Sequence, residues 1–280
     1  MYSCKDDRRT VKPVTYKYRT STTFMVRIAL TGAAGNVGRE LVDAFGDHDV
    51  VPFTHSETDD IDGELLDVTD PDDVRAKLDT FYAVVHLAGA SSPEAKWETV
   101  AETNVEGTKH VLDAAVENSI DRVVFASSNH AVGAYNAADD DPETTTLTDS
   151  RPVRGDAPAA PDSFYGVSKA ACEALTKYYA ERHGLEVVNL RIGWYMSEAD
   201  LREQTGDDVD PGKDRFARAT WLSPRDCRAV HRRAATADLP ETPVTVNAVS
   251  RNDRRYFTLT ETMQALGYRP RDNAEEVLDG

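Results

Sequence analysis

The sequence predicts an α/β protein with a doubly wound parallel sheet, and three observations support that prediction. Residues 25–31 form a short apolar, β-branched run of the kind that builds a buried parallel strand. A glycine-rich turn follows this run directly. Strand-like runs then alternate with longer helix-like runs up to residue 193, and such alternation produces a parallel sheet with helices on both faces.

The individual elements follow from the local pattern. Further strands are predicted near residues 50–54, 82–87, 122–127, 186–192 and 244–249. Helices are predicted near residues 37–45, 97–117, 164–183, 224–237 and 259–266. Another helix is predicted after Asp70, which is a good N-cap before a proline at the first helical position. Residues 136–162 are predicted to be a loop, and residues 194–220 read as polar and irregular.

Composition excludes several classes of protein. No apolar run approaches the roughly 20 residues of a membrane-spanning helix, and the first 24 residues lack the apolar segment of a signal peptide. The three cysteines, Cys4, Cys172 and Cys227, show neither a metal-ligand spacing nor a disulfide framework. We therefore expect a cytoplasmic protein that has no membrane partner.

The charge balance is strongly acidic. The formal net charge is −17, and because residues 1–24 carry +4, residues 25–280 carry −21. A surface of this sign repels nucleic acid and anionic membranes. It also destabilises the compact state unless salt screens it, which favours a protein adapted to a high-salt cytoplasm over an ordinary acidic enzyme.

The glycine-rich turn predicts a dinucleotide site. Gly32, Gly35 and Gly38 stand at the junction of the first strand and its helix. Glycine allows positive φ, close approach of the backbone to a pyrophosphate, and tight packing of helix on strand. Asn36 and Val37 open the helix whose N-terminus would face the phosphates. In this context the turn indicates a Rossmann-type core.

The end of the second strand predicts which cofactor is used. An acidic residue there usually binds the ribose 2′-hydroxyl of NAD, and none is present at this strand end. Thr54, His55 and Ser56 instead offer hydrogen-bond donors for a 2′-phosphate, so NADP is predicted to be preferred, with use of both NADP and NAD as the alternative. Asp67 is expected at the adenine edge. Three residues of a later strand end should pass beside the adenosine half of the cofactor: Leu87, Ala88 and Gly89.

Tyr165 and Lys169 predict the catalytic centre. They lie one turn apart on a predicted helix, and the ammonium stabilises the phenolate form of the tyrosine. Such a phenol takes the hydroxyl proton of an alcohol while hydride leaves its carbon, and the lysine can also bind the nicotinamide ribose. Ser128 ends a predicted strand and should bind the reacting oxygen. Asn129 and His130 are candidate substrate contacts, although a buried structural role suits His130 equally well. Since no second histidine lies near His130 in the sequence, no metal site is expected.

These motifs carry a family resemblance. The glycine turn, HLAG at 86–89, Asn104, Ser128 and the Tyr165–Lys169 pair resemble the extended short-chain dehydrogenases, the epimerase/dehydratase-like group, over residues 26–278. A narrower resemblance is to the branch of uronate dehydrogenases and of sugar and sugar-phosphate 1-dehydrogenases from halophiles. The segments that carry it are FASSNHAVGAY at 125–135, FYGVSKAACE at 164–173, LRIG at 190–193, ATWLSPRDC at 219–227 and GYRPRDNAEE at 267–276.

The resemblance implies oxidation of the anomeric carbon of an aldose to a lactone. Ser128, Tyr165 and Lys169 would be catalytic. Asn104 would be among the cofactor-binding residues, and Ser91 or Ser92 would lie near the sugar with Asn129 and His130. A homo-oligomer is also expected.

Two departures from the uronate-oxidising members concern the substrate. Those members have an arginine that binds the carboxylate where this sequence has Phe216, and a serine where it has Trp194. Arg215 remains as a neighbouring candidate contact. The more apolar pocket predicts a neutral pentose such as L-arabinose. The cations at positions 202, 213, 215 and 218 leave a sugar phosphate as an alternative, although they are better explained as offsetting the nearby acidic run.

Three regions are predicted along the chain. Residues 1–24 would form a flexible extension, or precede a true start at Met25; residues 25–193 a Rossmann-type dinucleotide-binding core with the catalytic helix; and residues 194–280 a small substrate-binding lobe. Three functions remain possible from the sequence: an aldose 1-dehydrogenase, a nucleotide-sugar epimerase or dehydratase, and a non-catalytic NADP(H) sensor. The compact C-terminal region disfavours the second, and the complete Ser, Tyr and Lys set disfavours the third.

Overall fold

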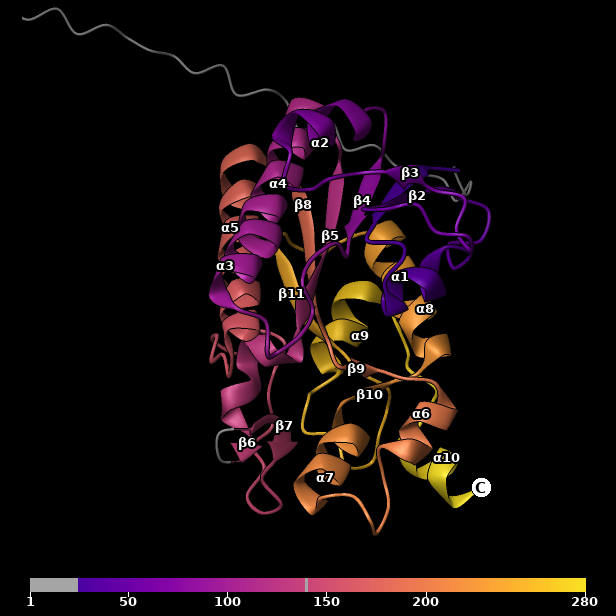
Figure 1. Ribbon diagram of the computed structural model, residues 1–280, viewed down its shortest axis with the longest axis vertical. Helices are drawn as coiled ribbons and strands as arrows, with labels where there is room; N and C mark the ends of the chain where they lie inside the picture. The colour runs from indigo at the N-terminus through magenta and orange to yellow at the C-terminus, as the bar shows by residue number, and fades with distance from the viewer. Residues whose placement is uncertain (1–24, 139–140) are drawn as a thin grey trace, which may run out of the picture.

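A parallel sheet of seven strands organises the chain (Figure 1). The computed structural model describes residues 25–138 and 141–280, so the predicted extension 1–24 lies outside the described residues. The sheet order is β11-β8-β5-β4-β1-β2-β3. The strands are β1 (Arg27–Thr31), β2 (Asp49–Thr54), β3 (Glu64–Leu65), β4 (Ala83–His86), β5 (Arg122–Ser128), β8 (Glu186–Ile192) and β11 (Val244–Ala248). From β1 the chain first adds strands on one side, β2 and β3, and then on the other side, beginning with β4. Open α/β sheets bind ligands at such a switch point, which here lies between β1 and β4.

Helices cover both faces of the sheet, as the alternation of elements predicts. One apolar cluster packs α2, α4 and α5 on one face, and another packs α1, α8 and α9 on the other face (Figure 1). These helices are α1 (Asn36–Leu41), α2 (Pro71–Lys77), α4 (Gly107–Glu117), α5 (Phe164–His183), α8 (Pro224–Thr236) and α9 (Thr260–Leu266). The prediction of a doubly wound parallel sheet is therefore confirmed.

The element boundaries agree with the sequence pattern where capping and periodicity are strong. Helix α5 and strand β8 have the predicted bounds. The side chain of Asp70 accepts hydrogen bonds from two backbone N–H groups of the first turn of α2, as expected of an N-cap. Helix α1 is shorter than predicted and ends at Leu41. The predicted helix 97–117 is divided into α3 (Trp97–Thr99), a π-helical segment (Val100–Glu106) and α4.

The segment 194–220 is more regular than the sequence suggested, so that prediction was wrong. It contains β9 (Trp194–Tyr195), α6 (Glu198–Glu203) and α7 (Pro211–Thr220). Both helices are short, polar and capped by side chains, with Ser197 and Asp210 as the N-caps. Charged residues fill their exposed faces, and this composition hid the helical pattern.

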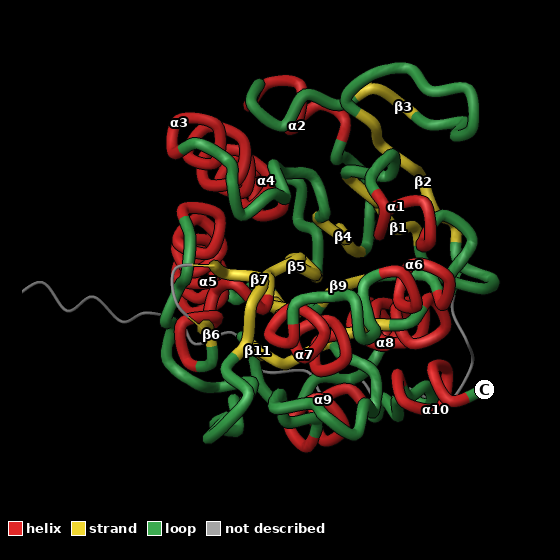
Figure 2. Tube along the Cα trace, turned by 60° about the horizontal axis from the view of Figure 1, so that its bottom comes forward, coloured by secondary structure: helices red, strands yellow, loops and turns green. Residues whose placement is uncertain are grey.

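The predicted lobe 194–280 also needs correction. Strand β11 pairs with β8 in the main sheet, and α8 contributes apolar side chains to the same core. Only part of the segment lies beyond the carboxyl ends of the strands: β9, α6, α7, β10 (Trp221–Leu222) and α10 (Ala274–Asp279). Figure 2 shows this end of the molecule, with α6 and α7 in front of the sheet. The predicted loop 136–162 includes a small antiparallel pair, β6 (Ala137–Ala138) and β7 (Asp141–Thr145).

Candidate active site

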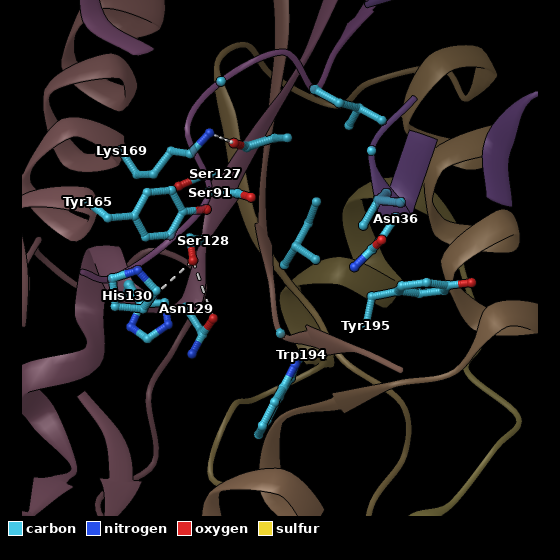
Figure 3. A pocket seen from close by; sticks show the side chains of 18 of the residues that line it. Asn36, Ser91, Ser127, Ser128, Asn129, His130, Tyr165, Lys169, Trp194 and Tyr195 are labelled. Atoms are coloured by element: carbon cyan, nitrogen blue, oxygen red, sulfur yellow. Dashed lines mark hydrogen bonds between the residues drawn. The ribbon is translucent and has the colours of Figure 1, made fainter. Parts of the chain in front are cut away.

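A cavity of 420 Å³ opens at the carboxyl ends of the central strands (Figure 3). Strand β5 supplies Ser128 and helix α5 supplies Tyr165 and Lys169, so the three predicted catalytic residues line one cavity. Figure 3 shows them on one wall, with Asn36 and Tyr195 on the opposite wall. The Ser163 side chain caps α5 by accepting from the backbone N–H of Gly166, which fixes the helical turn that presents the tyrosine.

The catalytic side chains are largely buried and held by local contacts. Tyr165 is 8% exposed and Lys169 is 4% exposed. The Lys169 ammonium donates to the carbonyl oxygen of Ala126 at 2.8 Å, and its Nζ lies 5.0 Å from the centre of the Phe125 ring. The lysine is thus anchored to β5 beside the phenol. A buried ammonium favours negative charge nearby, as proton removal by a phenolate requires.

Two adjacent serines at the end of β5 have different roles in the structure. Both line the cavity, but the Ser127 hydroxyl donates to Oε1 of Glu173 at 2.5 Å. The Ser128 hydroxyl oxygen accepts from the backbone N–H of His130 at 3.2 Å, and the hydroxyl lies 3.3 Å from Oδ1 of Asn129. Ser128 therefore has a defined orientation next to the phenol of Tyr165 (Figure 3).

Asn104 is not among the residues that line the catalytic cavity, and its place among the cofactor contacts stays a prediction. It lies in the π-helical segment, where its side chain accepts from the backbone N–H of Ala90 and donates to the carbonyl oxygen of Ala90. It also donates to the hydroxyl of Ser168 on the catalytic helix. Its amide therefore joins the loop after β4 to α5 and positions the two sides of the site.

The glycine turn has the shape that a pyrophosphate requires. Gly32 has φ of +71°, and a Cβ there would lie 2.6 Å from the backbone nitrogen of Ala88. A Cβ on Gly38 would lie 2.3 Å from the Gly32 carbonyl oxygen. Side chains are thus excluded from the turn, and the backbone at the start of α1 is open to the catalytic cavity through Gly35, Asn36 and Val37.

A second cavity, of 500 Å³, continues the first along the edge of the sheet. The two cavities share Gly35, Leu87 and Gly89 among their lining residues, and Ala88 lines the second. Together they form one elongated cleft across the switch point between β1 and β4. Its glycine-lined middle fits a dinucleotide, which when bound supplies the hydride acceptor.

The second cavity presents most of the residues predicted to contact the adenosine half. Thr54, His55 and Asp67 line it, whereas Ser56 is outside its lining and stays a predicted contact. Thr54 is buried and His55 is exposed. The Thr69 hydroxyl and backbone N–H donate to Oδ1 of Asp67 and lower the pKa of that carboxyl group, which therefore stays ionised.

An aromatic wall closes the substrate side of the catalytic cavity. The Trp194 and Phe216 rings lie 5.7 Å apart, and the Phe216 and His130 rings lie 6.1 Å apart. Ser91 and Asn129 line the same cavity. Arg215 is not among the lining residues, and its Nε is buried without a hydrogen-bond partner among the described residues, so its substrate contact stays a prediction.

Three further residues belong to this site and were not predicted from the sequence. Glu143 of β7 and Tyr195 of β9 line the cavity, and Tyr195 donates to Oε2 of Glu40 at 2.6 Å. Asp162 lies behind His130 and bonds to its Nδ1 at 2.9 Å. Each comes from a segment that was predicted to be irregular, where no periodic signal indicates which side chains point inward. The position of Asp162 just before the helix-capping serine was the only available signal.

The described residues contain neither a cluster suited to a metal ion nor a membrane-spanning helix. Among the described residues, no group of three or more histidines, cysteines, aspartates or glutamates could hold a metal ion. No helix within residues 25–138 and 141–280 is long and apolar enough to cross a membrane.

Comparison with known proteins agrees with the fold and the site. Residues 28–208 match the NAD dependent epimerase/dehydratase family. The chain belongs to this family. It is 50% identical over 256 residues to L-arabinose 1-dehydrogenase (NAD(P)(+)) of Haloferax volcanii, covering 91% of this chain and 100% of that protein. It is 37% identical to the NAD-dependent glucose-6-phosphate dehydrogenase of the same organism, covering 89% of this chain and 94% of that protein. The crystal structure of uronate dehydrogenase from Agrobacterium tumefaciens aligns with a TM-score of 0.73 at 28% identity, covering 90% of this chain and 86% of that one.

Proposed function

We propose that this protein is an NAD(P)-dependent sugar 1-dehydrogenase that oxidises the anomeric carbon of a neutral aldose, with L-arabinose as the substrate. The observation that carries the proposal is the cavity that brings Ser128, Tyr165 and Lys169 together beside an aromatic wall. The 50% identity to an L-arabinose 1-dehydrogenase over that protein's whole length supports the same substrate.

The chain's residues provide the acid–base part of this reaction. The anomeric hydroxyl lies between Ser128, which donates a hydrogen bond to its oxygen, and Tyr165, whose phenolate takes its proton as hydride leaves the carbon. The ammonium of Lys169, held beside the phenol by the Ala126 carbonyl, stabilises the phenolate and would bind the ribose of the cofactor. The ring product is a lactone, because the anomeric carbon already carries the ring oxygen.

The charge of the cavity favours a sugar without an anionic group. Apart from Lys169, no lysine or arginine is among the described residues that line it, and Glu143 places a carboxyl group there. A buried carboxylate or phosphate of a substrate would therefore lack a cationic partner and meet an acidic side chain. Trp194 offers a flat apolar surface for one face of a pyranose ring. The bulk of Trp194 beside Phe216 leaves less room for the extra ring substituent of a hexose.

The cofactor preference, the location and the assembly follow as proposals. NADP is preferred, because the end of β2 presents Thr54 and His55 to the adenosine cavity rather than a carboxylate. The enzyme works in a cytoplasm of high salt, as its charge of −17 favours. It is a homo-oligomer, as the family resemblance implies.

A substrate panel tests the proposal. The purified chain is mixed in molar KCl with NADP and with L-arabinose, glucose 6-phosphate or galacturonate, and the reduced nicotinamide is followed by absorbance. The highest kcat/KM is expected for L-arabinose. A clear preference for either charged sugar would refute the neutral-aldose substrate. An isomerised sugar without net reduction of the cofactor would indicate an epimerase, and cofactor binding without turnover on any sugar would indicate a sensor.

A matched variant tests whether the negative charge in the cavity disfavours anionic sugars. Glu143→Gln keeps the size of the side chain and removes its charge. We expect kcat/KM for glucose 6-phosphate and galacturonate to rise relative to that for L-arabinose. Glu203→Gln, at the exposed end of α6, is the control for a general change in surface charge.

A further inference from the structure

His130 and Asp162 form a buried pair behind the catalytic cavity. The Nδ1 atom of His130 lies 2.9 Å from Oδ2 of Asp162, and their side chains are only 8% and 4% exposed. They come from separate segments, since His130 follows β5 in a short 3₁₀ helix (Asn129–Tyr135) and Asp162 precedes α5. The rings of His130 and Tyr165 also form a T-shaped contact, with their centres 5.7 Å apart. The pair thus links the substrate wall to the catalytic helix.

Two glycines leave the space that this pair occupies. A Cβ on Gly133 would lie 1.6 Å from Oδ2 of Asp162, and a Cβ on Gly166 would lie 2.3 Å from the carbonyl oxygen of His130. A side chain at Gly133 would displace the carboxylate, and one at Gly166 would separate α5 from the 3₁₀ helix. The backbone is therefore built around the contact between His130 and Asp162.

The two oxygens of Asp162 have distinct partners. Oδ1 accepts from the hydroxyl of Ser163 at 2.9 Å, and the Ser163 oxygen in turn accepts from the Gly166 N–H at 3.0 Å to cap α5. Oδ2 faces His130. The Ser163 hydroxyl thus occupies Oδ1 and leaves Oδ2 for His130, so the two carboxylate oxygens have different partners.

This arrangement determines where the single proton of a neutral His130 resides. An ionised carboxylate only accepts hydrogen bonds, so Nδ1 must be the protonated nitrogen and Nε2 must carry a lone pair. Nε2 has no hydrogen-bond partner among the described residues, and His130 lines the catalytic cavity. We propose that Asp162 is a positioning residue that holds neutral His130 as the Nδ1–H tautomer, so that Nε2 accepts a hydrogen bond from a ring hydroxyl of the sugar.

The tautomer can be measured without any sugar. Nitrogen-15 NMR of the labelled wild-type protein distinguishes a protonated from an unprotonated imidazole nitrogen, and His130→Gln identifies the signals of His130. At neutral pH in molar KCl with NADP, we expect Nδ1 to be protonated and Nε2 unprotonated. A tautomer with the proton on Nε2, or an imidazolium, would overturn the inference. This measurement uses the wild-type chain and so does not depend on how any variant folds.

An isosteric variant tests the consequence for catalysis. In Asp162→Asn, the amide orientation that preserves the hydrogen bond from the Ser163 hydroxyl places the N–H₂ group against Nδ1 and moves the proton of His130 to Nε2. The same nitrogen-15 NMR measurement on this variant verifies that the proton has moved. We expect kcat/KM for L-arabinose to fall roughly tenfold to hundredfold, the usual cost of a mismatched hydrogen bond in a buried site, with KM for the cofactor unchanged. The control is Asp156→Asn, which removes the same charge from an exposed side chain earlier in the same loop and should leave activity unchanged.

Deoxy sugars separate positioning from a general structural effect. One of the 2-, 3- and 4-deoxy derivatives of L-arabinose lacks the hydroxyl that faces Nε2. In the wild type its removal should lower kcat/KM, whereas in Asp162→Asn the same removal should cost much less, because the hydrogen bond is already lost. Equal losses in both proteins for all three sugars would overturn the inference. The sugar half of this inference rests on the proposed function, and absence of any L-arabinose turnover by the wild type would refute that function separately from the tautomer.

Discussion

Replacement of Tyr165 by phenylalanine removes one oxygen and should separate catalysis from every other property of the site. The phenyl ring would keep its edge contact with His130, whose ring centre lies 5.7 Å away, and its position 5.6 Å from Nζ of Lys169. The hydroxyl makes no hydrogen bond to the described residues, so folding loses little when it is removed. The glycine turn that holds the cofactor is untouched.

The expected loss of activity corresponds to a higher activation free energy. Positioned acid–base catalysis contributes typically 10²–10⁴-fold, so the barrier should rise by roughly 3–5 kcal/mol. The assay is kcat for L-arabinose with NADP in molar KCl, together with cofactor affinity and the thermal unfolding midpoint of each protein. A kcat within threefold of the wild type, with intact folding, would refute the role of Tyr165 as the base.

Three further predictions concern the cofactor, pH and salt. His55→Asp should lower kcat/KM with NADP at least tenfold relative to NAD, because His55 is exposed in the adenosine cavity whereas Thr54 is buried; an unchanged ratio would contradict the proposed 2′-phosphate contact. Burial lowers the pKa of His86 to about 3 and that of His231 to about 4, so both are neutral in the folded protein and take up protons on unfolding below their ordinary value. Because the unfolded state binds these protons and the folded state does not, the free energy of unfolding is independent of both groups above pH ~6.5. It decreases as pH falls toward the folded-state values, by up to ~1.4 kcal/mol per pH unit for each histidine. Urea unfolding between pH 7 and 5 should show this slope, and His231→Gln should reduce it by about one such increment; an unchanged slope would contradict it. Raising KCl from dilute to about 1 M, where the Debye length is roughly 3 Å, should raise the unfolding midpoint, and no rise would contradict adaptation to high salt.

The sequence predicted those parts of the fold that have strong local signals. The apolar strands, the N-cap Asp70 and the helix that bears Tyr165 and Lys169 were all found, because burial and capping impose residue types at fixed spacings. The glycine turn was found for the same reason, since its glycines are required by backbone contacts rather than by side-chain packing.

The remaining parts depend on contacts between distant segments. Glu143 reaches the catalytic cavity through β7, and no pattern within that short polar stretch indicates its direction. Asp162 acquires its role only when the 3₁₀ helix brings His130 to it. Asn104 was predicted to contact the cofactor. Its hydrogen bonds to Ala90 and Ser168 were not predicted, because they depend on how the π-helical segment packs against α5. Tertiary packing, which the sequence pattern does not encode locally, decides all three.

The most direct test of the central claim follows the hydrogen on the anomeric carbon. L-arabinose that carries deuterium at C1 is incubated with the enzyme and NADP in molar KCl, and the products are analysed by mass spectrometry and NMR. The account predicts that the deuterium is transferred to the reduced nicotinamide and that the sugar is recovered as its lactone or the corresponding acid. Retention of the deuterium in the sugar product would contradict oxidation at the anomeric carbon.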